Sequence, residues 1–448
     1  MKQNTRLSII TLCFAAFLMS GFSGDHSLAV VSLDNPVAEA GRLPRLRTLP
    51  NGDALMSWVE PKGQGHALKF GVVHDGRWVR QGETAQGENW FVNWADFSSV
   101  VAIDENFWVA HWLAKQQGGK TYDYDVSLAI SHDAGRSWRE VGHPHRDGTA
   151  AEHGFATIFK DLDGAGIVWL DGREHVKKED KTKYPEKSGN FNLRYTHINR
   201  DGTMTDEQVL DNNTCTCCWT AVASTPEGAI AAWRGRTDDE IRDNRMALLR
   251  DGKWNSPKAL GAEGWKIAGC PVNGPSISAL GNKIVASWFT AEGDRPRVRA
   301  AFSEDGGVTF GKPIEIDDVS PLGRIGLTWR DSQSAVVSWL SAPAVEQKKS
   351  ALNVKVIYTD GRVEPTRQLV EVSSGRDTGV PQMVSTADGL LFAWTNPAPQ
   401  YGITTKLLRH ADLKLAVQNV SKDKRQQKLA MLDHKFTINA AICTSKHE

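Results

Sequence analysis

The sequence predicts an all-β fold, a β-propeller of seven four-stranded blades, with six blades as the alternative. Three observations predict it: a repeated Trp motif, strand and turn patterns without helical periodicity, and a repeat length that accounts for nearly the whole chain. In the motif, two or three small or aliphatic residues precede a Trp, and a polar loop follows. Its seven copies, 51 to 64 residues apart, end at Trp58, Trp112, Trp169, Trp233, Trp288, Trp339 and Trp394. A mean period of about 56 residues is long for a solenoid repeat and suits a propeller blade.

The segments around the Trp motifs can each be divided into the four strands of a blade. A first strand leads through a short turn to the Trp-bearing strand, and after a polar loop a third, alternating strand ends at a second turn. Seven such repeats use about 392 positions, so we expect a single domain over residues 28 to 418. The last repeat shows only a weak fourth strand near residues 413 to 417, and residues 28 to 33 are the alternative source of that strand. A strand from the other end of the chain would close the ring.

The amino terminus has the pattern of a cleavable signal peptide over residues 1 to 24. Lys2 and Arg6 precede an apolar run of about twelve residues, from Leu7 to Leu18, and small residues follow. The run is too short to cross a bilayer of about 30 Å as a helix, and no later segment is apolar enough. We therefore expect a periplasmic or secreted protein with no transmembrane segment after signal cleavage and a polar tail over residues 419 to 448. Because 53 basic residues balance 53 acidic ones, we expect no nucleic-acid partner.

Two of the second turns share the pattern Ser-x-Asp-x-Gly-x-Ser/Thr-aromatic, at residues 131–138 and 303–310. The Asp can accept backbone N–H bonds across the turn, the Gly adopts the left-handed conformation, and the aromatic ring packs between blades. These turns resemble the Asp-boxes (BNR repeats) of bacterial sialidases. The resemblance makes a six-bladed sialidase-type propeller the alternative ring, and it places the boxes on the face away from the ligand site.

Other segments extend this resemblance, but one departs from it. Arg42-Leu43-Pro44 is similar to the Arg-Ile-Pro start of sialidase propellers, whose Arg binds the substrate carboxylate. Segments 215–219, 265–275 and 321–324 resemble a group of exported bacterial sialidase-like proteins. Sialidases also need an Arg triad, an Asp acid/base and a Tyr–Glu pair whose Tyr attacks the sugar. The last two blades begin without a Tyr, so no catalytic residue is assigned, and we expect little or no turnover of simple aryl sialosides.

Polar residues are expected to gather at the mouth of the central channel. In a propeller, the loops that enter the inner strands and the loops after the second strands share one face. The candidate ligand-binding residues there are Arg42, Asp96, His153, Asp171, Arg173, Arg234, Arg236, Asn273, Arg324 and Asp377. Arg side chains bind carboxylate or sulfate groups through paired hydrogen bonds. Salt bridges between blades, with Asp171, Asp238 and Asp239, are the structural alternative.

Five cysteines remain after removal of the signal peptide. Four lie on the loops that enter blades 4 and 5, namely Cys215, Cys217, Cys218 and Cys270. In an oxidising compartment, a disulfide between Cys270 and one of the other three is the favoured interpretation. A thiolate site for copper or zinc, with His153 as an additional ligand, is the second. Redox chemistry is the third.

The leading hypothesis is an exported sialidase-like propeller that binds a small anionic carbohydrate or peptide ligand at an Arg- and Cys-lined channel mouth. An exo-acting glycoside hydrolase of the exo-α-sialidase type is the first alternative. An envelope module that handles copper or zinc, or that is structural, is the second. A carboxylate pair about 5 to 9.5 Å apart across the mouth would favour the glycosidase.

Overall fold

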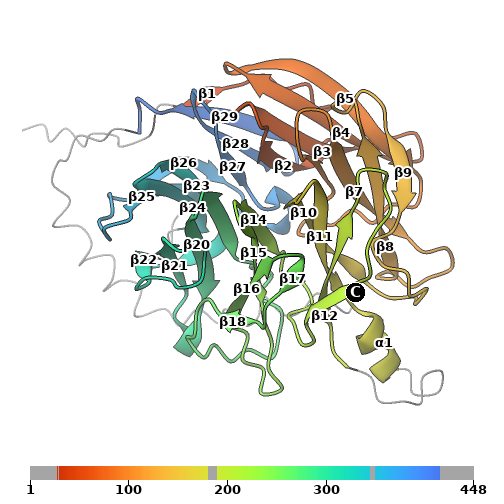
Figure 1. Ribbon diagram of the computed structural model, residues 1–448. Helices are drawn as coiled ribbons and strands as arrows, with labels where there is room; N and C mark the ends of the chain where they lie inside the picture. The colour runs from red at the N-terminus through yellow and green to blue at the C-terminus, as the bar shows by residue number, and fades with distance from the viewer. Residues whose placement is uncertain (1–27, 29, 180–188, 344–348, 414–448) are drawn as a thin grey trace, which may run out of the picture.

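Seven antiparallel sheets stand around a central axis in the computed structural model, which describes residues 28, 30–179, 189–343 and 349–413. Figure 1 shows the sheets as the blades of a ring, which the chain visits in order from red to blue. The predicted seven-bladed β-propeller is therefore confirmed. The predicted signal peptide and the polar tail lie outside the described residues.

Each blade runs from an inner strand at the channel to an outer strand at the rim. Blade 1 contains β2 (Arg42–Thr48), β3 (Ala54–Lys62), β4 (Gly65–His74) and β5 (Arg77–Gly87). Blade 2 contains β6 (Ser99–Ala102), β7 (Trp108–Lys115), β8 (Tyr124–Ser131) and β9 (Arg139–Gly142). Blade 3 contains β10 (His153–Asp161), β11 (Gly164–Asp171), β12 (Asn192–Ile198) and β13 (Gln208–Asp211). Blade 4 contains β14 (Ala221–Thr225), β15 (Gly228–Arg234) and β16 (Asn244–Arg250), with the short β17 (Lys253–Trp254) and β18 (Lys258–Ala259) outside them.

The remaining three blades complete the ring. Blade 5 contains β19 (Ser276–Leu280), β20 (Lys283–Thr290), β21 (Arg297–Ser303) and β22 (Ile314–Asp317). Blade 6 contains β23 (Pro321–Asp331), β24 (Ser334–Ser341), β25 (Ser350–Tyr358) and β26 (Arg367–Val372). Blade 7 contains β27 (Gln382–Ser385), β28 (Gly389–Thr395), β29 (Ile403–Arg409) and, as its outer strand, β1 (Val30–Ser32).

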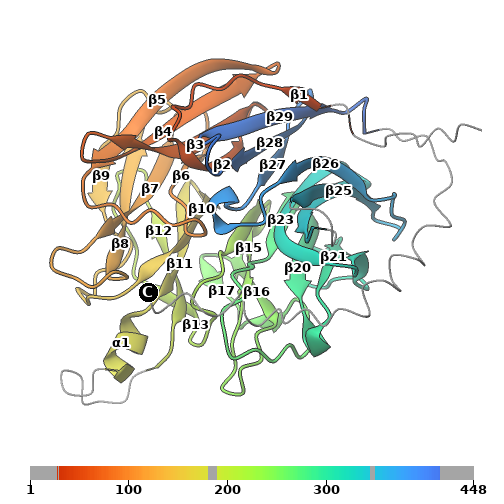
Figure 2. The same cartoon turned by 180° about the vertical axis from the view of Figure 1, so that it is seen from behind.

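The two ends of the propeller chain meet in blade 7. β1 pairs antiparallel with β29, with Val31 opposite Leu407, and the two strands lie side by side in both Figure 1 and Figure 2. The amino-terminal segment therefore supplies the outer strand of the last blade, which is the alternative that the sequence offered for residues 28 to 33. This pairing joins the first and last repeats through backbone hydrogen bonds.

Every Trp of the repeated motif lies on the second strand of its blade, as predicted. A buried indole N–H needs a hydrogen-bond acceptor, because leaving the donor unsatisfied costs free energy. Among the described residues, five of the seven donate to a carboxylate at 2.6–2.8 Å: Trp58 to Glu60, Trp169 to Asp171, Trp233 to Asp211, Trp288 to Glu263 and Trp339 to Asp317. In these five blades, the repeated Trp therefore contributes a hydrogen bond as well as an apolar ring.

The two Ser-x-Asp-x-Gly turns show the local bonds that their pattern predicts. Asp133 accepts hydrogen bonds from Ser131 Oγ at 2.7 Å and from the Ser137 backbone N–H at 2.9 Å, and Gly135 has a φ of 81°. The turn around Asp305 repeats these bonds. The Trp138 ring lies 6.3 Å from Phe70 of the neighbouring blade. Membership of the sialidase family stays a prediction.

Strand direction separates the two faces of the ring. Because the strands of a blade are antiparallel, each inner strand begins on the face where the second strand ends and the third begins. The two Ser-x-Asp-x-Gly turns connect third to fourth strands and therefore lie on the opposite face. The helix α1 (Arg173–Glu179) projects from the edge of the ring, as Figure 2 shows, and η1 (Glu292–Asp294) and η2 (Arg376–Thr378) are single turns in loops. Within the described ranges, no helix is long and apolar enough to span a membrane.

Candidate ligand-binding site at the channel mouth

A cavity of about 470 Å³ opens on the face where the inner strands begin. Its walls come from loops and strand ends of five blades, because the segments that enter the inner strands converge there. The apolar part consists of the aromatic side chains Phe91, Trp94, Tyr122 and Phe155. The polar part includes Asn93, Asp96, Glu152, Arg242 and Arg376. An apolar cavity with a few polar groups is the usual form of a small-molecule site. We refer to it as the mouth cavity.

One hydroxyl group connects two carboxyl groups in this wall. Tyr124, the first residue of β8, donates its hydroxyl to Asp96 Oδ2 at 2.7 Å and lies 3.3 Å from Glu152 Oε1. The Phe155 backbone N–H donates to Asp96 Oδ1 at 2.8 Å. A side chain at Gly154 would collide with both Asp96 and Tyr124, so this close approach requires a glycine. The three groups therefore form one hydrogen-bonded unit at the junction of blades 2 and 3.

Burial decides the protonation of this unit. Asp96 is 1% exposed, and burial raises the pKa of its carboxyl group to about 7, with the charge of Glu152 adding to the shift. The hydrogen bonds from Tyr124 and Phe155 oppose the shift but do not cancel it. Burial also raises the pKa of Tyr124 well above its usual value. Asp96 can therefore gain or lose a proton near neutral pH, as a general acid or base must.

Three predicted ligand-binding residues, Arg234, Arg324 and Asn273, instead hold the loops in place. The buried Arg234 donates to the carbonyl groups of Arg242, Asn273 and Phe289 at 2.7–2.9 Å. Arg324 donates to the carbonyl groups of Gly375 and Gly379, and its guanidinium lies 4.9 Å from the centre of the Trp94 ring. The Asn273 amide oxygen accepts the Arg324 backbone N–H at 2.9 Å. Of these, Arg324 acts on the mouth cavity indirectly, by supporting Trp94.

His153, Asp171 and Arg173 lie behind the mouth cavity, in a buried charged cluster between blades 2 and 3. Arg173 donates to both oxygens of Asp171, at 2.6 and 2.8 Å. His153 lies 3.3–3.8 Å from the carboxylates of Asp125, Asp147 and Asp171. Burial lowers the pKa of His153, but the hydrogen bonds and charges of these carboxylates outweigh it and raise the pKa to about 9. This arrangement matches the structural alternative of ion pairing between blades.

The other predicted residues lie at the rim. Exposed Arg42 and Asp377 line a second cavity of about 300 Å³, which shares Trp94 with the mouth cavity. Arg236 is bound by Glu240. The structure therefore brings Arg42, Asp96 and Asp377 to the two mouth-face cavities, while Arg236 lines neither.

The four predicted cysteines meet at the edge of the mouth cavity. Cys217 and Cys270 form a disulfide with a Cα–Cα distance of 6.2 Å, and both line the cavity. Cys215 and Cys218 are buried free thiols, with Sγ atoms 3.5 Å apart. Burial opposes ionisation of Cys215, but the hydrogen bond from Cys218 and the charges of Arg242 and Arg234 outweigh it and lower its pKa. All four sulfur atoms lie within 4.8 Å of one another, so a soft-metal site stays a prediction.

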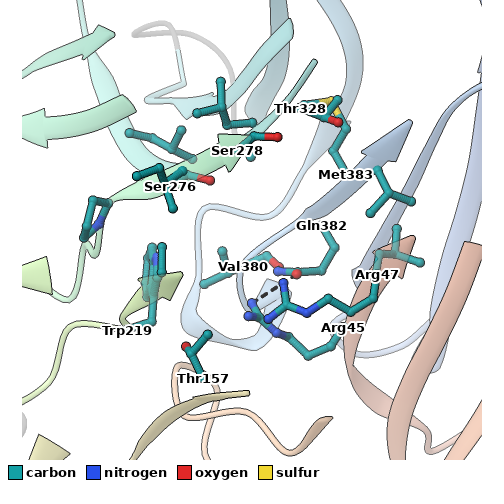
Figure 3. Close-up of a pocket in the computed structure, with 18 of the residues that line it drawn as sticks. Arg45, Arg47, Thr157, Trp219, Ser276, Ser278, Thr328, Val380, Gln382 and Met383 are labelled. Atoms are coloured by element: carbon teal, nitrogen blue, oxygen red, sulfur yellow. Dashed lines mark hydrogen bonds between the residues drawn. The ribbon is translucent and has the colours of Figure 1, made fainter. Parts of the chain in front are cut away.

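Below the mouth cavity, the channel holds a cavity of about 220 Å³ between the inner strands (Figure 3). Thr157 follows Phe155 by two residues and Trp219 follows Cys217 by two, so the same segments line both cavities. Figure 3 shows the guanidinium groups of Arg45 and Arg47 in this cavity beside Gln382. We refer to it as the channel cavity.

The sequence did not single out the aromatic wall, Tyr124 or the two channel arginines. In the sequence, Tyr124 is only the start of an alternating strand, and the resemblance to sialidases points to a tyrosine in the last two blades alone. A third strand begins on the mouth face, so its first residue is a candidate in any blade. The strand pattern of the repeats therefore marks Tyr124 as a candidate.

No protein-family profile and no curated protein matches the chain. Among solved structures, it is similar to an α-L-arabinofuranosidase from Fusarium graminearum, with 11% identity over 87% of this chain and 99% of that one and a TM-score of 0.46. An ulvan lyase shows 13% identity, covers 88% of this chain and 99% of its own length, and has a TM-score of 0.47. A protein of unknown function from Dyadobacter fermentans shows 13% identity over 85% and 97%, with a TM-score of 0.45. At these values, the similarities carry no argument about the ligand of this chain.

Proposed function

We propose that the protein is exported and that its mouth cavity binds a saccharide with an anionic group. The observation that carries this proposal is the combination, in one cavity, of aromatic rings with an unpaired guanidinium group. The cavity volume of about 470 Å³ lies within the range of small-molecule sites, about 300–1,000 Å³. Several aromatic rings line the mouth cavity, which suits the apolar C–H faces of sugar rings.

The charged groups indicate the character of the ligand. The side chain of Arg376 makes no hydrogen bond or ion pair with any described residue, and it lines the cavity from η2. Arg242 also lines the cavity, where Glu240 binds it at 2.7 Å. An unpaired guanidinium favours a carboxylate or sulfate, which it can bind through two parallel hydrogen bonds. Glu152 and Asn93 add acceptors and a donor that suit sugar hydroxyl groups.

Isothermal titration calorimetry with a matched pair of ligands tests this proposal. One ligand is an oligosaccharide that contains glucuronic acid, and the other is the same oligosaccharide with its carboxyl groups reduced to alcohols. The acidic form is expected to bind at least about tenfold more tightly, since a charge-assisted hydrogen bond contributes about 1.5–3 kcal/mol. Equal affinities would reject the anionic ligand, and an acidic peptide that binds instead would reject the saccharide.

Glycoside cleavage at the same cavity is a second candidate function. The specific observation is the Asp96–Tyr124–Glu152 unit, in which one carboxyl group has a pKa of about 7. A protonated Asp96 could donate a proton to a leaving group, and Glu152 could accept one. If the chain cleaves the acidic oligosaccharide, the rate should depend on a group with a pKa near 7, and Asp96→Asn should abolish this dependence. No new reducing ends across the pH range would reject cleavage while leaving the binding proposal standing.

A further inference from the structure

The channel cavity receives two arginine side chains from one strand. Side chains of a β-strand alternate between its two faces, so Arg45 and Arg47 of β2 share the channel face while Leu46 points into the blade core. Figure 3 shows both guanidinium groups in the same cavity. Arg45 donates to Gln382 Oε1 at 3.1 Å and lies 4.7 Å from the centre of the Phe97 ring. Arg47 makes no hydrogen bond or ion pair with any described residue.

No acidic side chain in the described lining of the channel cavity balances this pair. Burial and the neighbouring charge of Arg47 lower the pKa of Arg45 well below its usual value. Burial also lowers the pKa of His111 to about 3, and the charges of Arg45 and Arg47 add to that effect. Two like charges in a partly enclosed space repel each other and favour a counter-ion.

The remaining lining groups suit an oxyanion. Hydroxyl groups line the cavity at Thr48, Thr157, Thr220, Ser276, Ser278 and Thr328, and Gln382 adds a side-chain amide that already donates to the Val380 carbonyl at 2.8 Å. Thr157 and Thr220 already donate to backbone carbonyl groups, whereas the hydroxyls of Ser276 and Ser278 make no hydrogen bond with a described residue and can donate to anion oxygens. Guanidinium forks match tetrahedral oxyanions through paired bonds. The volume of about 220 Å³ leaves room for such an ion and ordered water.

We propose that the channel cavity is a binding site for a sulfate- or phosphate-like oxyanion, held by Arg45 and Arg47. The site is separate from the mouth cavity and does not depend on the saccharide proposal. The oxyanion can be a free ion, or it can be a sulfate group on a ligand that reaches down from the mouth. Both sources present the same chemistry to the two guanidinium groups.

Equilibrium dialysis with radiolabelled sulfate, and then phosphate, measures free-ion binding to the full chain directly. Thermal unfolding in sulfate and in chloride at equal ionic strength provides the second readout. A ligand that binds only the folded state raises the unfolding temperature with the logarithm of its concentration. We expect sulfate to stabilise the protein beyond chloride and the stabilisation to grow with concentration.

Matched variants separate specific binding from the general stabilising effect of sulfate on proteins. Arg45→Met and Arg47→Met keep the aliphatic part of each side chain and remove its charge. Arg77→Met is the control, because Arg77 is exposed on the outer strand β5 of the same blade. Each channel variant should bind the oxyanion about tenfold to a hundredfold more weakly, and the control should match the wild type. Arg47→Met is the safer variant, since it breaks no hydrogen bond to a described residue.

The change in unfolding temperature that a substitution causes in the absence of the oxyanion is a further test of the site. In Arg47→Met, which loses no hydrogen bond to a described residue, removing one of two repelling charges should leave the unfolding temperature in dilute buffer unchanged or higher. Loss of the sulfate-specific increase together with this unchanged baseline would support the site. An equal sulfate response in wild type, Arg45→Met and Arg47→Met, with no dialysable ion retained, would overturn it.

A final comparison identifies the source of the oxyanion. A sulfated oligosaccharide and its desulfated form are titrated into wild type and Arg47→Met. If inorganic sulfate binds and the two oligosaccharides do not differ, the site takes the free ion. If only the sulfated oligosaccharide binds, and Arg47→Met abolishes its advantage, the site takes a sulfate group of the ligand.

Discussion

Two polar clusters lie on opposite sides of the same backbone segments at the junction of blades 2 and 3. Tyr124 and Asp125 are neighbours on β8, and Glu152 and His153 are neighbours at the start of β10. Because successive side chains of a strand point to opposite sides, Tyr124 and Glu152 face the mouth cavity while Asp125 and His153 face the interior of the junction. The same backbone therefore holds both clusters.

The clusters differ in how their charges are balanced. The interior cluster pairs its carboxylates with cations: Arg173 binds Asp171, and His153 lies among three carboxylates. On the cavity side, the partners of Asp96 are neutral donors, the Tyr124 hydroxyl and a backbone N–H. The pKa of Asp171 is accordingly lowered, because Arg173 and His153 outweigh burial, whereas burial raises the pKa of Asp96. A balanced cluster stabilises the fold, and an unbalanced carboxyl group at a cavity is available for binding or proton transfer.

The largest effect is expected from breaking the interior cluster. Asp171→Asn removes the closest carboxylate of the buried Arg173, while Glu207 and Asp147 remain 2.9 and 3.2 Å away. The change should cost about 3 kcal/mol of unfolding free energy, the lower end for a broken buried ion pair. Urea unfolding measures the change. Asp251→Asn, at an exposed turn, is the matched control and should change stability little. A loss below about 0.5 kcal/mol, the usual size for a surface substitution, would show that the cluster is not a structural element.

The disulfide beside the mouth cavity should give a comparable or slightly smaller effect. Cys270→Ala, or reduction of the wild type, should lower the unfolding free energy by about 2–5 kcal/mol, the usual cost of losing a disulfide in an exported domain. Cys218→Ala is the control, because Cys218 is outside the disulfide and its variant should keep the sensitivity to reductant. Four reduced thiols with copper or zinc retained, and stability lost to a chelator rather than to a reductant, would establish the metal site instead.

The stability that the interior cluster provides should depend on pH, because His153 loses its proton at alkaline pH. Its pKa is about 9 in the folded protein and about 6.5 in an unfolded chain, so folding favours the protonated form. Its contribution is fully present below pH 6.5 and is lost as the pH rises through 9, by up to about 3 kcal/mol. Urea unfolding from pH 6 to pH 10, with His153→Gln for comparison, checks this. A variant that loses stability with the same pH profile as the wild type would contradict it.

On the cavity side, the substitution is expected to raise stability rather than lower it. The pKa of Asp96 is about 7 in the folded protein, so stability should fall as the pH rises from about 4 to 7, where only the unfolded chain readily ionises this group. Asp96→Asn keeps the shape and should flatten this region of the profile, with a gain in stability at pH 7 of up to about 4 kcal/mol. A large loss of stability would mean that Asp96 stabilises the fold as Asp171 does.

The fold could be predicted from the sequence because it depends on local patterns that repeat. Each Trp marks a second strand, and each Asp-Gly turn ends a third, so the order and number of blades follow from spacing alone. Ring closure by β1 could also be anticipated, since an isolated strand precedes the first repeat while the last repeat shows only a weak fourth strand.

The candidate site was only partly predictable, because convergence of loops does not reveal what each side chain binds. Arg234 and Arg324 were expected at the mouth, but backbone carbonyl groups of neighbouring loops occupy their guanidinium groups. In the sequence, Arg45 and Arg47 look like ordinary strand residues. They become a candidate anion site only because the described channel lining contains no acidic side chain. Which charged side chains have partners is visible only in the three-dimensional structure.

The most direct test of the mouth cavity as the ligand site is calorimetric titration of the glucuronate-containing oligosaccharide into two variants. Arg376→Met removes the unpaired guanidinium in the cavity wall, and Arg77→Met removes an exposed one on the rim of blade 1. Binding is expected to be about tenfold to a hundredfold weaker for Arg376→Met and unchanged for Arg77→Met. Wild-type affinity in Arg376→Met, or an equal loss in both variants, would contradict it.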